Sequence, residues 1–298
     1  MDPSSQPQSA ARAPAAARLT PRDLGICLLV ALGFGPALPV LLRAWSGAEY
    51  HAYAFLVPIV AAALALWKRP ALARLPARPD ARGLGLLAAS FALFATGFFA
   101  ALPTAIGLAV VGAAAGSVLA LRGRPHLSEL GFPIGYLLFM VPLPRSLVDP
   151  AIAELRLLTT DVAVALLQLF ALPVMHEGNI VVLPHQRLFV AEACSGVNSV
   201  VALLPAAALL GYFRSGFATR TALVASVLPI ALFWNLIRLL GTALAALQLP
   251  GQDLVTEGPL HELAGILTFG LGCLSLLAVD DLARRIRGGP RRELRASS

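Results

Sequence analysis

The segment that organises this chain runs Val190-Ala191-Glu192-Ala193-Cys194-Ser195-Gly196-Val197-Asn198-Ser199, and the apolar run 200–210 follows it directly. Small residues that favour turns separate the thiol of Cys194 from this run, so the segment predicts a cysteine held at the mouth of a membrane helix. Backbone N–H groups and the positive end of the helix dipole favour the anionic sulfur there. The segment therefore favours a reactive cysteine, and the alternative is a small apolar residue that fills space at a helix end.

The composition predicts a polytopic membrane protein. Of the 298 residues, 58% are hydrophobic and only 13% are charged, whereas a soluble domain carries about 25% charged residues. The mean hydropathy is +0.78. A net charge of +7 could suggest a nucleic-acid partner, but the basic residues are distributed by membrane side, so we expect no nucleic-acid partner.

The cysteines exclude a disulfide framework. The chain has three, of which Cys27 and Cys273 lie inside apolar runs and are expected to be buried small hydrophobes. Only Cys194 has polar neighbours. The zinc-ligand spacing C-x-x-C, a Walker loop and a dinucleotide fingerprint are all absent from the sequence, so neither a metal nor a cofactor is expected.

Apolar runs predict the membrane helices. A basic tail rich in Ala, Pro and Ser comes first and is expected to be disordered. The apolar runs lie at about 24–42, 52–67, 83–101, 104–121, 129–143, 148–172, 196–213, 221–240 and 263–280. The first of them, at about 19 residues, suits a retained membrane span better than the core of a signal peptide.

Positive charges decide which runs cross the membrane. Most of the 23 Lys and Arg residues fall in clusters at 12–22, 68–82, 122–124, 214–220 and 284–295. All of these clusters face the cytoplasm if the run 148–172 does not cross. That run carries Asp149, Glu154, Arg156 and Asp161, which are costly at the bilayer centre. We therefore expect an all-α protein with eight transmembrane helices and both termini cytoplasmic, plus an outer interfacial or re-entrant amphipathic helix over 148–172.

This topology divides the chain into three parts. Residues 1–22 form a disordered basic N-terminal tail, residues 23–282 a transmembrane domain, and residues 283–298 a basic cytoplasmic C-terminal tail.

The same topology gathers three reactive residues on the outer side. Cys194 lies at the outer end of the sixth span, Arg238 three residues from the outer end of the seventh, and His261 at the outer start of the eighth. Arg238 stays protonated and can stabilise a thiolate or an oxyanion. His261 can move a proton, because imidazole titrates near neutral pH. Together they form the nucleophile, base and polar partner of nucleophilic catalysis.

Two polar residues are supporting candidates. Asn235 precedes Arg238 by three residues, so both lie on one helical face, and this favours an interior polar cluster over an arginine that only reaches the headgroups. Glu192 stands two residues before Cys194.

Residues 173–190 connect the amphipathic helix to the cysteine segment. Gly178-Asn179 lies between extended apolar residues and predicts a small hairpin or an extended loop. An extended peptide could pair with such a segment by strand addition, although a plain connection is the simpler interpretation. His176 and His185 are rival bases here, ranked below His261 because neither accompanies a constellation at a helix end.

These residues resemble the exosortase/archaeosortase family of membrane-embedded cysteine transpeptidases. The resemblance runs from about residue 50 to 279. Its most specific part is the cysteine segment with the preceding Gly178-Asn179 and Leu183-Pro184, and the Pro-rich aromatic segment Phe132–Pro144 precedes both. The resemblance extends to Asn235-x-x-Arg238 and to His261 with Gly265. It implies that Cys194 is the nucleophile of an acyl-enzyme and that Arg238 and His261 complete the catalytic set.

The sequence departs from the family pattern in two places. Tyr50-His51-Ala52-Tyr53 stands where the family usually has Tyr-Ser-His-Gly, so His51 is a candidate of lower rank. Asn198 occupies a place where many bacterial members carry arginine.

The resemblance implies a thiol protease and transpeptidase of a bacterial inner membrane, with its active site on the extracytoplasmic side. Its partners would be secreted proteins whose C-terminal tail holds a short motif, a transmembrane helix and a basic end, and an acceptor amine, hydroxyl or water. The alternative is a non-catalytic transporter or scaffold for exported polysaccharide, whose Arg238 binds an anion. A transporter is expected to carry polar residues near the midplane of several helices, whereas here they gather at one face.

Overall fold

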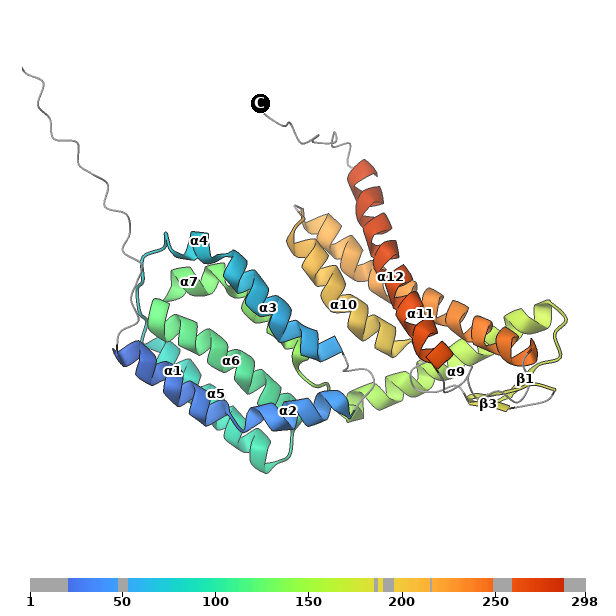
Figure 1. Ribbon diagram of the computed structural model, residues 1–298, viewed down its shortest axis with the longest axis horizontal. Coiled ribbons are helices and arrows are strands. Elements are labelled where there is room, and N and C mark those ends of the chain that lie inside the picture. Colours follow the sequence, from blue (N-terminus) through green and yellow to red (C-terminus); the bar gives the residue numbers. More distant parts are fainter. Residues whose placement is uncertain are drawn as a thin grey trace, which may run out of the picture. The chain divides into compact units, whose positions relative to one another are not determined.

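The structure is a computed structural model that describes residues 21–47, 53–184, 187–189, 196–214, 216–248 and 259–286. These residues are helical apart from one small sheet. The chain divides into two compact units, Met1–Arg43 with Phe55–Val141 and Ala44–Ala54 with Pro142–Ser298. Figure 1 colours the first from blue to green, and the second from green to red apart from its first segment.

The first unit holds the helices before residue 142. They are α1 (Pro21–Phe34), most of α2 (Ala37–Ser46), α3 (Leu56–Trp67), α4 (Arg69–Leu72), α5 (Arg82–Phe99), α6 (Pro103–Arg122), α7 (Arg124–Glu129), α8 (Gly131–Tyr136) and the 3-10 helix η2 (Leu137–Met140). Helices α5 and α6 form its closest pair, because small residues let the two backbones approach. A Cβ at Gly83 would collide with the backbone of Ala120, and one at Gly116 would lie 3.0 Å from Leu87.

The first predicted span is broken. Instead of one helix over 24–42, α1 and α2 are separated at Gly35-Pro36 and the chain bends by 49° there. Proline has no N–H to donate to the preceding turn, and its ring excludes the carbonyl four residues back. The apolar run alone did not reveal this break, although Pro36 is its signal in the sequence.

The second unit holds α9 (Arg145–Leu169), the strands β1 (Met175–Glu177), β2 (Ile180–Val182) and β3 (Arg187–Phe189), and the helices α10 (Val197–Tyr212), α11 (Phe217–Gln248) and α12 (Pro259–Ile286). Helices α10, α11 and α12 share an apolar core. Its buried side chains are Leu203, Ala207, Val227, Ala231 and Leu276.

Helix α9 is amphipathic, as expected. Asp149, Glu154 and Asp161 are exposed, whereas Val148 and Ile152 pack against Val197 at the start of α10. Helix α9 is not among the described helices that are long and apolar enough to cross a membrane.

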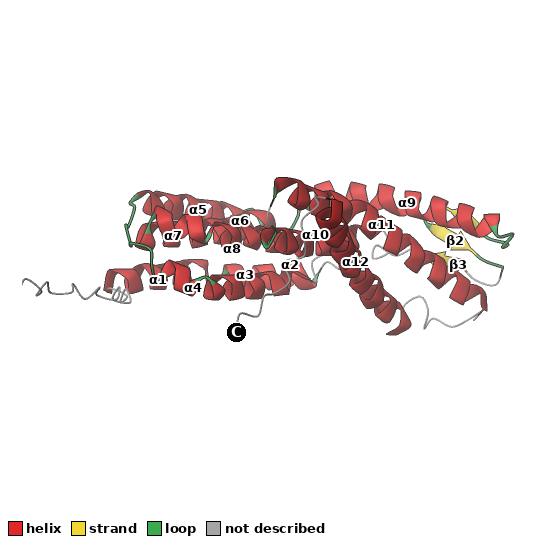
Figure 2. Cartoon of the chain, turned by 90° about the horizontal axis from the view of Figure 1, so that it is seen from above, coloured by secondary structure: helices red, strands yellow, loops and turns green. Residues whose placement is uncertain are grey.

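The predicted hairpin at Gly178-Asn179 is confirmed and supplies two strands of a three-stranded sheet. The strands are antiparallel in the order β1-β2-β3, and Gly178 has a φ of +62°, which glycine adopts without strain. The sequence analysis did not anticipate β3, which is only three residues long. One face of the sheet packs on α9 and on the far end of α11, and Figure 2 shows the yellow strands beside these two helices.

The described helices support a multi-pass membrane protein. Four are long and apolar enough to span: α5, α6, α11 and residues Leu263–Ile286 of α12, or five if α1 and α2 form one bent span. The apolar helices over 53–67, 131–140 and 197–212 are shorter. Eight spans with two cytoplasmic termini therefore stay a prediction.

Candidate functional site

The three predicted catalytic residues belong to the second unit. Arg238 lies in α11, and the backbone of His261 lies in the first turn of α12. Cys194 and Glu192 lie outside the described residues, but Gly196, two residues after Cys194, is described and is buried at the start of α10.

Gly196 packs against Asn235 of α11. A Cβ at Gly196 would lie 3.1 Å from Cδ2 of Leu232 and 3.5 Å from Nδ2 of Asn235. Its φ is +81°, a left-handed conformation that costs other residues about 1–2 kcal/mol. Asn235 is 1% exposed. The chain therefore needs glycine at 196, both for this backbone turn and for its close approach to α11.

Arg238, one helical turn further along α11, packs against α12. A Cβ at Gly265 would lie 3.6 Å from Cζ and Nη1 and 3.7 Å from Nη2 of Arg238. The guanidinium thus lies beside Gly265, in space that the side chain of another residue would take. Gly265 follows His261 by four residues, so the two share one face of α12.

These contacts bring three distant parts of the sequence to one section of α11. Asn235 and Arg238 are about 4.5 Å apart along the helix axis. Asn235 contacts Gly196, two residues after Cys194, and Arg238 contacts Gly265, four residues after His261. The structure therefore brings together Gly196, Asn235, Arg238 and Gly265.

The position of Arg238 within its helix differs from the prediction. It was expected three residues from the end of the span 221–240, but α11 continues to Gln248. Residues 243–248 are good helix formers, whereas Gly241 and Thr242 are not, and Ala243 and Ala246 pack against α9 and the sheet. Tertiary packing therefore extends the helix beyond the apolar run.

Arginines gather where α10 ends, α11 begins and α12 ends. Nη2 of Arg214, at the end of α10, lies 2.9 Å from Oδ2 of Asp280, and Nη2 of Arg284 lies 3.3 Å from the same oxygen. Arg220 donates to the carbonyl oxygen of Arg214 from Nε and Nη2, at 3.2 and 3.0 Å. The sequence analysis missed Asp280, which is fully buried. Its spacing of four residues to Arg284 is the signal that could have found it.

Arg220 and Arg238 are separated along α11 by about one membrane thickness. From Arg220 to Arg238, α11 rises about 27 Å, and a bilayer has a hydrocarbon core of about 30 Å. That the clusters 214–220 and 284–295 lie on one side of the membrane and Arg238 near the other stays a prediction.

Of the alternative bases predicted from the sequence, the structure describes His176. It lies in β1, and its Nδ1 is 3.6 Å from Oδ1 of Asp161 in α9 and 3.4 Å from the carbonyl oxygen of Gly178. His176 therefore links the sheet to α9. His51 and His185 lie outside the described residues.

An apolar groove lies beside the Gly196 turn. Its volume is about 200 Å³, and α9 and α11 line it with Leu158, Thr159, Val162, Leu232, Phe233 and Leu236. Leu232 belongs both to this groove and to the contact with Gly196. The described ranges contain no cluster of His, Cys, Asp or Glu that could hold a metal ion.

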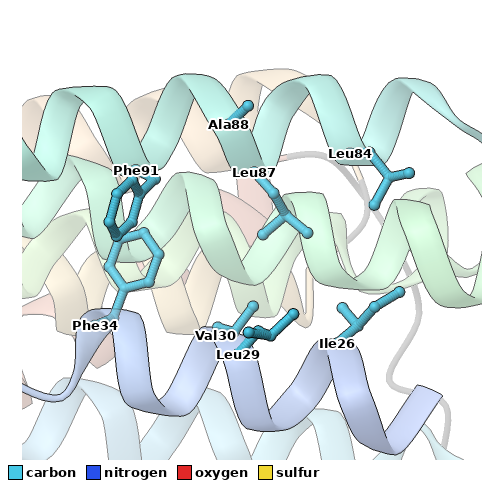
Figure 3. Close-up of a pocket in the computed structure, with 8 residues that line it drawn as sticks. All are labelled: Ile26, Leu29, Val30, Phe34, Leu84, Leu87, Ala88 and Phe91. Carbon is cyan, nitrogen blue, oxygen red and sulfur yellow. The ribbon is translucent and has the colours of Figure 1, made fainter. Parts of the chain in front are cut away.

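A second apolar cavity, of about 310 Å³, lies in the first unit between α1 and α5. Figure 3 shows Phe34 and Phe91 close together at one end of it, with ring centroids 6.2 Å apart. Its lining consists of Ile26, Leu29, Val30, Phe34, Leu84, Leu87, Ala88 and Phe91. None of these side chains can transfer a proton or act as a nucleophile, so the cavity offers no catalytic chemistry.

Residues 45–278 match the model of one protein family, described as transmembrane exosortase (Exosortase_EpsH). The matched range includes Cys194, Arg238 and His261. No curated protein and no solved structure matched the chain.

Proposed function

The chain belongs to the transmembrane exosortase family, and we propose that it is a cysteine endopeptidase and transpeptidase that cuts the C-terminal sorting tails of secreted proteins. Its substrates would carry a short motif, a transmembrane helix and a basic end. The cut would fall at the outer face of a bacterial inner membrane, where the cysteine turn and Arg238 are proposed to lie.

One observation carries this proposal. Gly196, two residues after Cys194, packs on Asn235, and the guanidinium of Arg238 packs on Gly265, four residues after His261. The three segments that would supply nucleophile, cation and base therefore meet on two successive turns of α11. Nucleophilic catalysis needs these groups within reach of one peptide bond.

In the proposed reaction, the thiolate of Cys194 attacks the carbonyl carbon of the substrate peptide bond. The carbonyl oxygen becomes an oxyanion, and Arg238 stabilises its charge. The C–N bond then breaks, and His261 donates a proton to the leaving amine. The product is a thioester between Cys194 and the secreted protein.

The thioester is resolved by an acceptor amine, a hydroxyl or water. His261 removes the proton of this acceptor while it attacks the thioester carbonyl. The C–S bond breaks and the Cys194 thiolate is restored. Transfer and hydrolysis differ only in the acceptor, so the same three residues serve both outcomes.

Asn235 and Gly265 would act as positioning residues. Asn235 would support the start of α10, which follows the nucleophile by two residues, because Gly196 packs directly on its side chain. Gly265 leaves space for the guanidinium of Arg238. Glu192, two residues before Cys194, stays a supporting candidate from the sequence.

The decisive experiment replaces Cys194 by alanine or serine in cells that express a precursor with such a tail. The expected result is that uncut precursor accumulates in the membrane. Cys273→Ala is the matched control, because Cys273 packs in the apolar core of α10, α11 and α12, and it should process normally. Unchanged processing in Cys194→Ala would contradict the nucleophile assignment and favour the transporter or scaffold.

A membrane-impermeant maleimide tests the proposed side of the membrane. Added from outside, it should label Cys194 and leave Cys273, which is half-buried in a membrane helix, unlabelled. A protein with Cys194→Ala should then take up no label. Labelling of Cys194 only after the membrane is opened would reverse the topology.

A further inference from the structure

The outer strand of the small sheet has a backbone edge that no described strand occupies. In the two-residue hairpin at Gly178-Asn179, Glu177 and Ile180 form the closing hydrogen-bonded pair. Hydrogen-bonding directions alternate along an antiparallel strand, so Val181 turns its N–H and C=O toward Leu188, its partner on β3. The N–H and C=O groups of Arg187 and Phe189 consequently point away from β2, toward the free edge of β3.

Helix α9 packs on one face of the sheet. Helix α9 packs against β1 and β2, and Asp161 pairs with His176 of β1 at 3.6 Å. Val181 and Leu188 are buried in the core that the sheet shares with α9 and α11. One face of the sheet is thus covered by helices, and within the described ranges β1 and β3 are its two edge strands.

We propose that β3 binds the substrate by strand addition: an extended segment of the secreted precursor, just before its membrane helix, pairs with the free edge of β3. This inference rests on the proposed function and names how that site would hold its substrate. Strand addition uses main-chain hydrogen bonds, so it suits an enzyme that accepts several proteins with a common short motif.

The distance along the chain supports this occupant over any other peptide. β3 ends at Phe189, and Cys194 follows five residues later. Five extended residues span at most about 17 Å. A peptide paired with β3 would therefore place one of its own peptide bonds near the sulfur of Cys194. That bond would lie a few residues from the paired segment. In the sequence, β3 is followed by α10, and the paired segment of the precursor is followed by its own membrane helix. In this proposal both helices enter the membrane from the same face, so the two strands would run parallel.

The side chains beside this edge are polar and accessible. Arg187 is paired with Glu177 across the sheet, with Nη2 3.2 Å from Oε2, and both side chains are more than half exposed. They lie on the face opposite the buried Val181 and Leu188. A bound peptide would be held by the backbone of β3, so these two side chains would stay in water and take no part in its binding.

Two substitutions of Arg187 distinguish the contribution of its backbone N–H from that of its side chain. Arg187→Pro removes an N–H that points to the free edge and leaves the bonds between Val181 and Leu188 intact, and edge strands tolerate proline at such positions. Processing should slow about five- to tenfold, the effect of one lost hydrogen bond. Arg187→Ala, which keeps the N–H, should process within about twofold of the unchanged protein. Equal rates for the two variants would overturn the proposal.

Photo-crosslinking provides a second measurement that does not depend on the proline variant folding. A benzophenone side chain is placed at Arg187 or at the exposed Met175 on β1, in the Cys194→Ala protein that retains its precursor. Position 187 should crosslink to the segment before the precursor's membrane helix, and position 175 should not. Crosslinks only from 175, from both positions equally, or from neither, would contradict binding at β3. If Cys194→Ala still cuts the precursor, the proposed function itself fails.

Discussion

The guanidinium of Arg238 in α11 lies against the backbone of Gly265 in α12, and the Cζ atom of Arg238 is 3.6 Å from where a Cβ of residue 265 would stand. Helices α11 and α12, which end at Gln248 and begin at Pro259, are in contact there through the Arg238 side chain and the position where Gly265 has none. Any side chain larger than a methyl group at 265 would have to move the cation. This contact therefore offers a way to shift Arg238 without changing its charge.

Substitutions at Gly265 should show a sharp dependence on size. Gly265→Ala should retain activity, because a methyl group at 3.6 Å makes an ordinary van der Waals contact. Gly265→Leu should displace the guanidinium and slow cleavage by about 10²- to 10³-fold, as expected for the loss of an oxyanion-stabilising group. The measurement is the rate of precursor cleavage in membranes. Equal loss in both variants would mean that α12 fails to pack and that Arg238 is not specifically affected.

Arg238→Lys should lose most activity although it keeps the positive charge. Lysine presents a compact ammonium in place of a planar group with five donors, so it cannot contact both Gly265 and the substrate oxyanion in the same geometry. Arg145→Lys, at an exposed arginine in the first turn of α9, is the matched control and should have no effect. Cleavage kinetics would distinguish them, and full activity in Arg238→Lys would leave Arg238 with only a structural role.

Gly196→Ala should destabilise the protein and impair cleavage together. Alanine at a φ of +81° is strained by about 1–2 kcal/mol, and its methyl group would press on Leu232. Gly178→Ala is the matched control, because Gly178 also has a positive φ but no atom stands near its Cβ position. Thermal unfolding in detergent gives the stability, and a larger loss at 178 than at 196 would contradict this account.

Asp280→Asn should destabilise the second unit without touching the proposed active site. The carboxylate of Asp280 is fully buried and pairs with Arg214 and Arg284, whose side chains are partly exposed, so we expect a loss of about 1–3 kcal/mol. Asp281→Asn is the matched control. Asp281 is about half exposed, and its loss should cost less than about 1 kcal/mol. Thermal unfolding measures the stability lost in each variant. Equal losses for Asp280→Asn and Asp281→Asn would mean that the buried ion pair contributes nothing.

Acid should weaken the first unit through His126. Burial and the charge of Arg122 lower the pKa of His126, against a smaller opposing effect from the carbonyl groups of Arg122 and Leu72. The unfolded chain, with a pKa of 6.5, therefore binds the proton first as the pH falls. The stability contribution is complete above about pH 6.5 and is lost as the pH falls toward the lower pKa of the folded state.

The test compares thermal unfolding at about pH 7.5 and about pH 5. His126→Gln should show a smaller loss of stability on acidification than the unchanged protein. His176→Gln, at an accessible histidine of the sheet, serves as the control. An identical pH dependence in the protein with His126→Gln would remove His126 from the explanation.

The sequence was informative wherever a local pattern has one physical solution. Long apolar runs in a chain with few charges can only be membrane helices, and α5, α6, α11 and α12 follow the predicted runs. The acidic residues of α9 marked an amphipathic helix, because each of them is costly in hydrocarbon. Gly178-Asn179 predicted its hairpin, since few residues accept that turn. The cysteine, arginine and histidine segments identified the family, which the match over residues 45–278 supports.

The sequence by itself thus identified a helical multi-pass membrane protein of this family and suggested the candidate residues Cys194, Arg238 and His261, because these depend on composition and on short patterns. Only the tertiary structure decided that α11 extends to Gln248, that Asp280 joins two helix ends, and that Gly196 and Gly265 face successive turns of α11. Each of these depends on side chains far apart in the sequence that meet in one core. Contact energies of that kind leave no local pattern in the residues that make them.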